Sequence, residues 1–261
     1  MIFDGEAHFE ISGLPDACVA CNDRLRALVP DDRILNCRKI AVLNRGERLS
    51  SHGDAGLCLW VILEGVAATC TTLADGRRQI VSLELGGDLL CGMSTADGTD
   101  AQIEALTDCR LCEIDVTSAT EPLLQNPAVA ASMFHHVHRR LERAAVHLTA
   151  LGRLDSMERI CLFLLQMARR TGRQDGRALK AELGMSREDI ADYLGLNAET
   201  VSRVMGRVKR KGLAVFLSPT AYVVPDVRAL ERRIPLTFQG EFPMAAPANG
   251  HESRATGGCP L

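Results

Sequence analysis

A stretch near position 200 has the residue types and the spacing to read DNA. Glu199, Ser202 and Arg203 lie on one stripe if this stretch is helical, and Arg207 follows further along the outer face. In a major groove an arginine can donate two hydrogen bonds to guanine, and a glutamate can accept one from the cytosine amino group. Lys209 lies in the basic run from 203 to 211, which suits contacts to phosphate. These residues predict a nucleic-acid interface.

The surrounding sequence predicts two helices that would carry this stripe. Ser186 and Asp189 form a capping box at the start of the first helix, and Gly195 lies where the chain must turn tightly. Asn197 can cap the second helix. The inner face of that helix is apolar and consists of Val201, Val204, Met205 and Val208. An ordinary helix pair with a solvated charged face is the alternative, but the two short strands expected in LAVFLSPTAYVV favour a winged helix-turn-helix domain.

The cysteines form a second group with chemical potential. The chain has 10 of them and no secretory signal, so metal or redox chemistry is favoured over a disulfide framework. Cys18 and Cys21 form a C-x-x-C in which two thiolates can reach one metal centre. Together with Cys109 and Cys112 they could form a four-thiolate zinc site, act as a redox switch, or be inert. The histidines at positions 135, 136 and 138 flank an apolar seam and are assigned no ligand role.

The composition excludes several classes of protein. With 261 residues, a formal charge of -3 and 46% hydrophobic residues, the chain can form one large or two medium globular domains. It lacks a run of about 18 apolar residues and an apolar stretch near its N-terminus, which argues against a membrane span and a signal peptide and favours the cytoplasm. Because it has no P-loop, G-x-G-x-x-G, H-E-x-x-H or G-x-S-x-G motif, we do not expect an enzyme.

The rest of the sequence indicates an α+β fold. Between residues 38 and 115, strand-length runs such as CLWVIL and QIVSLEL alternate with glycine-centred turns, as in an antiparallel β-barrel or β-roll. A helix is expected to begin at Asn126-Pro127 and to be interrupted at Gly152. Asp155 and Glu158 then form a capping box at the start of another helix. The segment TGRQDGRA is expected to be a polar loop. We expect a cysteine-containing segment (1–30), a β-roll domain (31–125), a dimerisation helix (126–152), a winged helix-turn-helix domain (153–236) and a disordered tail (237–261).

An apolar seam in the expected long helix predicts a homodimer. Its members alternate between spacings of three and four residues: Phe134, Val137, Leu141, Ala144, Leu148 and Leu151. This period of about 3.5 residues suits the pairing of two helices. A helix that lies on its own β-roll is the alternative, and both arrangements can hold on different faces. Since the seam carries no charge, we expect a dimer that persists without a cofactor.

The stretch DIADYLGLNAETVSRVMGR resembles the DNA-recognition motif of the Crp–Fnr superfamily of bacterial transcription regulators. Its E-x-x-S-R arrangement is similar to that of the Fnr/FixK-like branch, and the order of elements over about residues 15–235 resembles the family as well. The resemblance implies that Glu199, Ser202 and Arg203 recognise a TTGAT-like half-site, repeated as a palindrome and bound by a dimer. It also implies RNA polymerase as a partner.

The resemblance implies that the β-roll (31–125) is a sensor domain like the cyclic-nucleotide-binding domains. In this family the β-roll can bind cyclic nucleotides, haem, other small molecules or nothing. The cyclic-nucleotide branch needs an arginine for the phosphate, but no arginine or lysine occurs between residues 79 and 109. Asp97, Asp100 and Glu104 add negative charge there, so a cyclic nucleotide is not expected.

Similarity to Fnr implies instead a four-iron four-sulfur (4Fe-4S) cluster that responds to oxygen or redox state. Its ligands would include Cys18, Cys21 and Cys112, the last in the matching context LCEID. The third N-terminal cysteine of the family is missing, and Cys37, Cys109 and Asp23 are candidates for the fourth ligand. Residues three apart on a strand point to opposite faces, which disfavours Cys109 beside Cys112, so Cys37 is favoured. A regulator without a cluster, sensing nitric oxide, a haem-bound gas or a small molecule, is the alternative.

Overall fold

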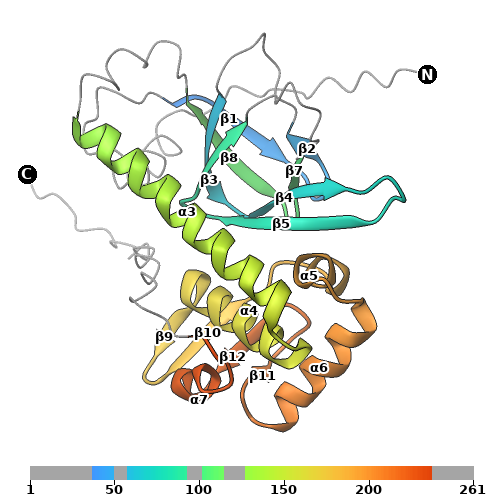
Figure 1. Ribbon diagram of the computed structural model, residues 1–261. Helices are drawn as coiled ribbons and strands as arrows, with labels where there is room; N and C mark the ends of the chain where they lie inside the picture. The colour runs from blue at the N-terminus through green and yellow to red at the C-terminus, as the bar shows by residue number, and fades with distance from the viewer. Residues whose placement is uncertain (1–36, 50–57, 93–101, 115–126, 237–261) are drawn as a thin grey trace, which may run out of the picture. The chain divides into compact units, whose positions relative to one another are not determined.

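The computed structural model describes residues 37–49, 58–92, 102–114 and 127–236 (Figure 1). They fall into two compact units. The first contains the described residues up to Ile160 together with Gly184–Gly206, and the second contains Cys161–Leu183 and the described residues from Arg207 onward. The expected N-terminal segment (1–30) and tail (237–261) lie outside the described residues. No helix in the described ranges is long and apolar enough to cross a membrane.

The described strands of the first unit form two four-stranded antiparallel sheets, ordered β1-β8-β3-β6 and β2-β7-β4-β5. They are β1 (Cys37–Leu43), β2 (Arg48–Leu49), β3 (Cys58–Glu64), β4 (Val66–Thr72), β5 (Arg78–Leu85), β6 (Leu89–Gly92), β7 (Gln102–Ala105) and β8 (Cys109–Ile114). A core drawn from both sheets includes Trp60, Ile62, Leu90, Ile103 and Leu111. The strand-length apolar runs of the sequence therefore form the predicted β-roll.

Two consecutive helices follow the β-roll. α3 (Pro127–Arg153) begins at the predicted proline and ends one residue after Gly152, close to the predicted interruption. α4 (Ser156–Thr171) has the predicted cap: Glu158 N donates to Asp155 Oδ1 at 2.9 Å, and Asp155 N donates to Glu158 Oε2 at 2.9 Å.

The second unit contains a small antiparallel sheet ordered β11-β12-β10-β9. Its strands are β9 (Arg173–Asp175), β10 (Ala178–Glu182), β11 (Val215–Phe216) and β12 (Ala221–Val224), and α7 (Val227–Glu231) follows. The predicted strand pair about the Ser-Pro turn is confirmed as β11 and β12. TGRQDGRA, however, forms most of the β9–β10 hairpin and is not a loop, because Gly176 supplies a positive φ of 59° for a tight turn.

The remaining helices are α5 (Arg187–Leu194) and α6 (Ala198–Arg210), which a short turn connects. A β-roll, a long helix and a helix pair with a small hairpin make an α+β protein, as the sequence predicts.

Candidate nucleic-acid interface

The first helix of the pair begins and ends as its sequence dictates. Ser186 Oγ accepts from the backbone N–H of Asp189 at 3.1 Å, and Asp189 Oδ2 accepts from the backbone N–H of Ser186 at 3.0 Å, which confirms the capping box. Gly195 ends α5 with φ 61° and ψ 42°, the left-handed conformation that favours glycine. The chain thus leaves α5 in a fixed direction toward α6.

The second helix is anchored by its cap and by its inner face. Asn197 Oδ1 accepts from Thr200 N at 2.7 Å, as the sequence predicts. The buried residues of its inner face are Val201, Val204, Met205 and Val208. Ile190 and Leu194 of α5 are buried as well. Burial of the apolar side chains of both helices leaves the opposite face of α6 to solvent.

That outer face brings together the residues that the sequence singled out. Glu199 and Arg203 are 80% and 68% exposed, and Arg203 Nη1 lies 3.8 Å from Glu199 Oε1. Ser202 is exposed beside them, and so are Arg207 and Lys209 toward the end of the helix. A hydroxyl, a carboxylate and a guanidinium therefore share one solvent-facing stripe, next to positive charge that can meet phosphate.

Thr200 is a member of this face that the sequence reasoning missed. Arg203 Nη2 donates to Thr200 Oγ1 at 3.2 Å, so the guanidinium has a partner one helical turn back on its own helix. The spacing of three residues was the signal that would have found it.

Comparison with known proteins identifies the two halves of the chain separately. Residues 41–126 match the model of the cyclic nucleotide-binding domain, and residues 158–233 match that of the Crp-like helix-turn-helix domain. The nitrogen fixation regulation protein FixK of Azorhizobium caulinodans is 33% identical over 193 residues, which are 74% of this chain and 77% of that protein. The chain belongs to the Crp–Fnr superfamily, in its FixK-like branch.

Further relatives agree with this placement. The transcriptional activator protein FnrL of Cereibacter sphaeroides is 30% identical over 189 residues, 71% of this chain and 76% of that protein. The solved structure of FixK2 from Bradyrhizobium japonicum superposes with a TM-score of 0.67 at 27% identity, covering 77% of this chain and 98% of that one. This Crp–Fnr protein is accordingly a transcription regulator with a DNA-binding helix-turn-helix domain, of a family that acts as dimers.

The β-roll of this Crp–Fnr regulator contains two of the predicted cluster ligands within the described residues. Cys112 on β8 is fully buried and disulfide-bonded. Cys37 is described as backbone of β1, whereas Cys18, Cys21 and Asp23 lie outside the described residues. The described part of the chain holds no group of three or more residues that could bind a metal ion.

Cys109, the competing fourth ligand, belongs to the core between the two sheets. Its Sγ donates to the carbonyl oxygens of Thr107 at 3.2 Å and Val66 at 3.3 Å. Burial raises the pKa of this thiol, although the hydrogen bonds with Thr107 and Val66 act in the opposite direction. A protonated thiol in an apolar core is a poor metal ligand.

Arginines of this chain partly neutralise the carboxylates on β5, just after it and on β7. Glu84 is buried and lies 3.2 Å from Arg140 and 3.6 Å from Arg143, both on α3, and Arg143 also lies 3.3 Å from Asp88. Glu104 is paired with Arg78 at 2.6 Å. Asp97 and Asp100 lie outside the described residues. The described carboxylates are therefore held by arginines of this chain.

The predicted dimer seam lies largely in solvent within the single chain. Phe134, Val137, Leu141 and Leu148 of α3 are 64–75% exposed, and Ala144 is exposed between them. Leu151 differs, because it is half-buried and its Cδ2 lies close to Gly195. His135 and His138 are exposed beside the seam, and His138 pairs with Glu142 at 3.3 Å.

Proposed function

We propose that this protein binds a TTGAT-like palindrome as a homodimer, with α6 of each subunit in a major groove. Glu199, Ser202 and Arg203 would contact base edges, while Arg207 and Lys209 would contact phosphate. The observation that carries the proposal is the joint exposure of Glu199 and Arg203 on one stripe of α6. In this proposal residues 31–125 form the sensor, 126–152 the dimerisation helix and 153–236 the DNA-binding domain, and the regulator acts in the cytoplasm on RNA polymerase.

The geometry of Arg203 supports a reading role. Its ion pair with Glu199 is solvent-exposed and long, so exchanging it for a base edge costs little. The hydrogen bond to Thr200 restricts the guanidinium while leaving its other donors available. A restricted guanidinium loses less side-chain entropy when it binds guanine through two hydrogen bonds.

The test compares Arg203→Ala with Lys209→Ala on the palindrome and on random DNA. Losing a bidentate contact to guanine should cost Arg203→Ala about 1–3 kcal/mol on the palindrome and relax the preference at one base pair. Lys209→Ala should weaken binding to both DNAs to a similar degree and make the affinity less dependent on salt concentration. Equal losses on palindromic and random DNA for Arg203→Ala would refute the assigned role.

For the signal, we propose a 4Fe-4S cluster held by Cys18, Cys21, Cys112 and Cys37. When bound, such a cluster supplies sensitivity to oxygen. The register of β1 and β8 supports the pair from the described strands: Cys37 is paired with Ile114, two residues beyond Cys112, after a bulge between Cys37 and Lys39. Cys37 and Cys112 therefore lie on adjacent strands, toward the same end of the β1–β8 pair.

A redox-active thiol pair is the second candidate, and the disulfide of Cys112 favours it. Anaerobic iron and sulfide content separates the two, measured for the wild type and for Cys112→Ser and Cys37→Ser. Cys109→Ser is the matched control, because Cys109 faces the core. About four iron and four sulfide per chain, lost in the first two variants and kept in the control, would support the cluster. Iron-free protein with a reducible disulfide would support the thiol pair, and a Soret band would indicate haem.

We also propose that no cyclic nucleotide binds. The described acidic groups Glu84 and Asp88 already share the arginines of α3, so an added phosphate would compete with them for the same cations.

A further inference from the structure

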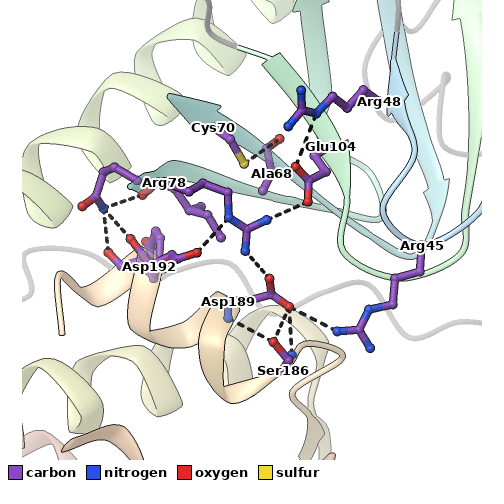
Figure 2. Close-up of polar contacts among 12 residues, drawn as sticks. Arg45, Arg48, Ala68, Cys70, Arg78, Glu104, Ser186, Asp189 and Asp192 are labelled. Atoms are coloured by element: carbon purple, nitrogen blue, oxygen red, sulfur yellow. Dashed lines mark hydrogen bonds and ion pairs between the residues drawn. The ribbon is translucent and has the colours of Figure 1, made fainter. Parts of the chain in front are cut away.

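One arginine at the start of β5 holds carboxylates from two distant parts of the chain. Figure 2 shows the guanidinium of Arg78 among Glu104 of β7 and two carboxylates of α5. Arg78 Nη1 donates to Glu104 Oε1 at 2.6 Å, and Nε donates to Asp192 Oδ2 at 2.8 Å. The remaining nitrogen, Nη2, donates to Asp189 Oδ1. All three nitrogens of one side chain are thus used between the β-roll and the first helix of the DNA-binding pair.

Neighbouring side chains of the β-roll reinforce this connection. Gln79 Nε2 donates to the backbone oxygen of Asp192 at 2.6 Å and to that of Tyr193 at 3.3 Å. Arg45 Nη2 lies 3.4 Å from Asp189 Oδ2. Side chains of the β-roll therefore contact α5 near its N-terminus, through Asp189, and near its C-terminus, through the last backbone carbonyls.

The burial of these groups makes the connection strong. The side chain of Arg78 is 22% exposed and that of Asp189 only 9%. Burial alone would raise the pKa of Asp189, but hydrogen bonds from Arg78 and Ser186 hold it below its usual value. Removing Arg78 would leave three carboxylates close together, one of them buried, without their common cation. Breaking a buried pair from one side is costly for this reason.

We propose that Arg78 is a latch that fixes the direction of the recognition helix α6 relative to the β-roll of the same subunit, and thereby sets which half-site spacing the dimer accepts. Both α5 and α6 bury apolar side chains, such as Leu194 and Val201, and a tight turn at Gly195 connects the two helices, so holding α5 also restricts α6. A dimer binds a palindrome only when its two recognition helices match the separation of the half-sites. Because the latch already holds each helix pair in place, binding to DNA loses less conformational entropy. This inference rests on the proposed function.

The matched pair of variants is Arg78→Ala and Arg77→Ala. Arg77 is adjacent in sequence, but its side chain is 77% exposed and pairs with Asp75 of the same turn. Dissociation constants of the full chain are measured on a single TTGAT half-site, on the palindrome, and on palindromes with the spacer lengthened or shortened by one base pair.

Arg78→Ala should bind the palindrome roughly tenfold more weakly than wild type and should discriminate less between spacers. Binding to the single half-site should stay unchanged, and Arg77→Ala should behave as wild type in every assay. Should Arg78→Ala fail to fold, Asp192→Asn takes its place, because this change keeps the Asp189 cap and removes one carboxylate of the latch.

The latch is refuted if these variants bind and discriminate among spacers as Arg77→Ala does. It is also refuted if the single half-site and the palindrome lose affinity equally. Failure of the wild type to prefer TTGAT half-sites over random DNA would instead overturn the proposed function.

Discussion

His147 is a buried imidazole held between three elements of the first unit. It lies on α3, its ring stacks on Tyr193 of α5 with centroids 4.1 Å apart, and it hydrogen-bonds with the backbone of Ile80 on β5. Burial, with the nearby charge of Arg159, lowers the pKa of His147 to about 4, although the bond with Ile80 acts in the opposite direction. Its Nε2 has no hydrogen-bond partner among the described atoms. The ring is therefore neutral at physiological pH.

This burial predicts a specific loss of stability in acid. Because the unfolded chain has the ordinary histidine pKa of 6.5, it binds a proton before the folded chain does. The stabilising contribution is complete above pH 6.5 and is lost as the pH falls toward 4. It amounts to at most about 3 kcal/mol. Urea unfolding of wild type and His147→Gln between pH 8 and pH 5 measures it: the difference in unfolding free energy should shrink toward acid pH. Parallel curves of unfolding free energy against pH would contradict the prediction. The carboxylates titrate alike in both proteins, so only His147 can change the difference.

At the scale of elements, Gly195 at the end of α5 and Gly152 near the end of α3 should change protein stability in opposite directions when each is replaced by alanine. Gly195 has a φ of 61°, and an added Cβ would lie 3.3 Å from Leu151 Cδ2. Gly152 has no positive φ, and a Cβ there would meet nothing within 4 Å. Gly195→Ala should therefore destabilise the protein by about 1–2 kcal/mol, because the Cβ of alanine crowds the backbone in the left-handed conformation. Gly152→Ala should stabilise it by about 0.5–1 kcal/mol. Thermal unfolding checks both, and shifts of the same sign would argue against this account.

Local sequence signals were sufficient for elements whose determinants lie within a few residues. The capping boxes at Ser186 and Asp155 and the turn at Gly195 are of this kind, because each depends on groups at most a helical turn apart. The β9–β10 hairpin was missed because β9 is exposed and polar, so it has no apolar alternation. Its signal was Asp175-Gly176, a dipeptide that favours tight hairpin turns. Gly152 marks the end of α3 to within one residue, because glycine weakens a helix.

Contacts across the whole molecule are the part that the sequence does not reveal. Arg78 meets Asp189 and Asp192 across 111 and 114 positions, and no periodicity links residues so far apart. The outward stripe of α6 could be predicted because helical periodicity alone places Glu199 and Arg203 together. Glu104 was read from sequence as a charge that would repel a phosphate, and the structure adds that it is an ion-pair partner of Arg78. The fold class thus follows from the sequence, while the ion pairs between the β-roll and α5 follow from the structure.

The exposed apolar stripe of α3 leads to the last prediction, which concerns the assembled dimer. Full burial of a large apolar side chain contributes about 1.5–3 kcal/mol, so four such residues per subunit could drive association. Leu141 lies mid-seam and is 66% exposed. Leu141→Arg would place two like charges against each other in a dry interface and should give a monomer. Val42→Arg is the control, because Val42 is 63% exposed and lies on β1, which is not part of the seam.

Sedimentation of aerobically prepared protein at several concentrations tests whether the stripe of α3 forms the dimer interface. Wild type and Val42→Arg should sediment as dimers even without a cofactor, because nothing charged lies in the seam. Leu141→Arg should sediment as a monomer and lose the preference for the palindrome over a single half-site, since one subunit offers one recognition helix. A dimeric Leu141→Arg variant would show that the stripe is not the dimer interface. A monomeric wild type would contradict the prediction that the dimer persists without a cofactor.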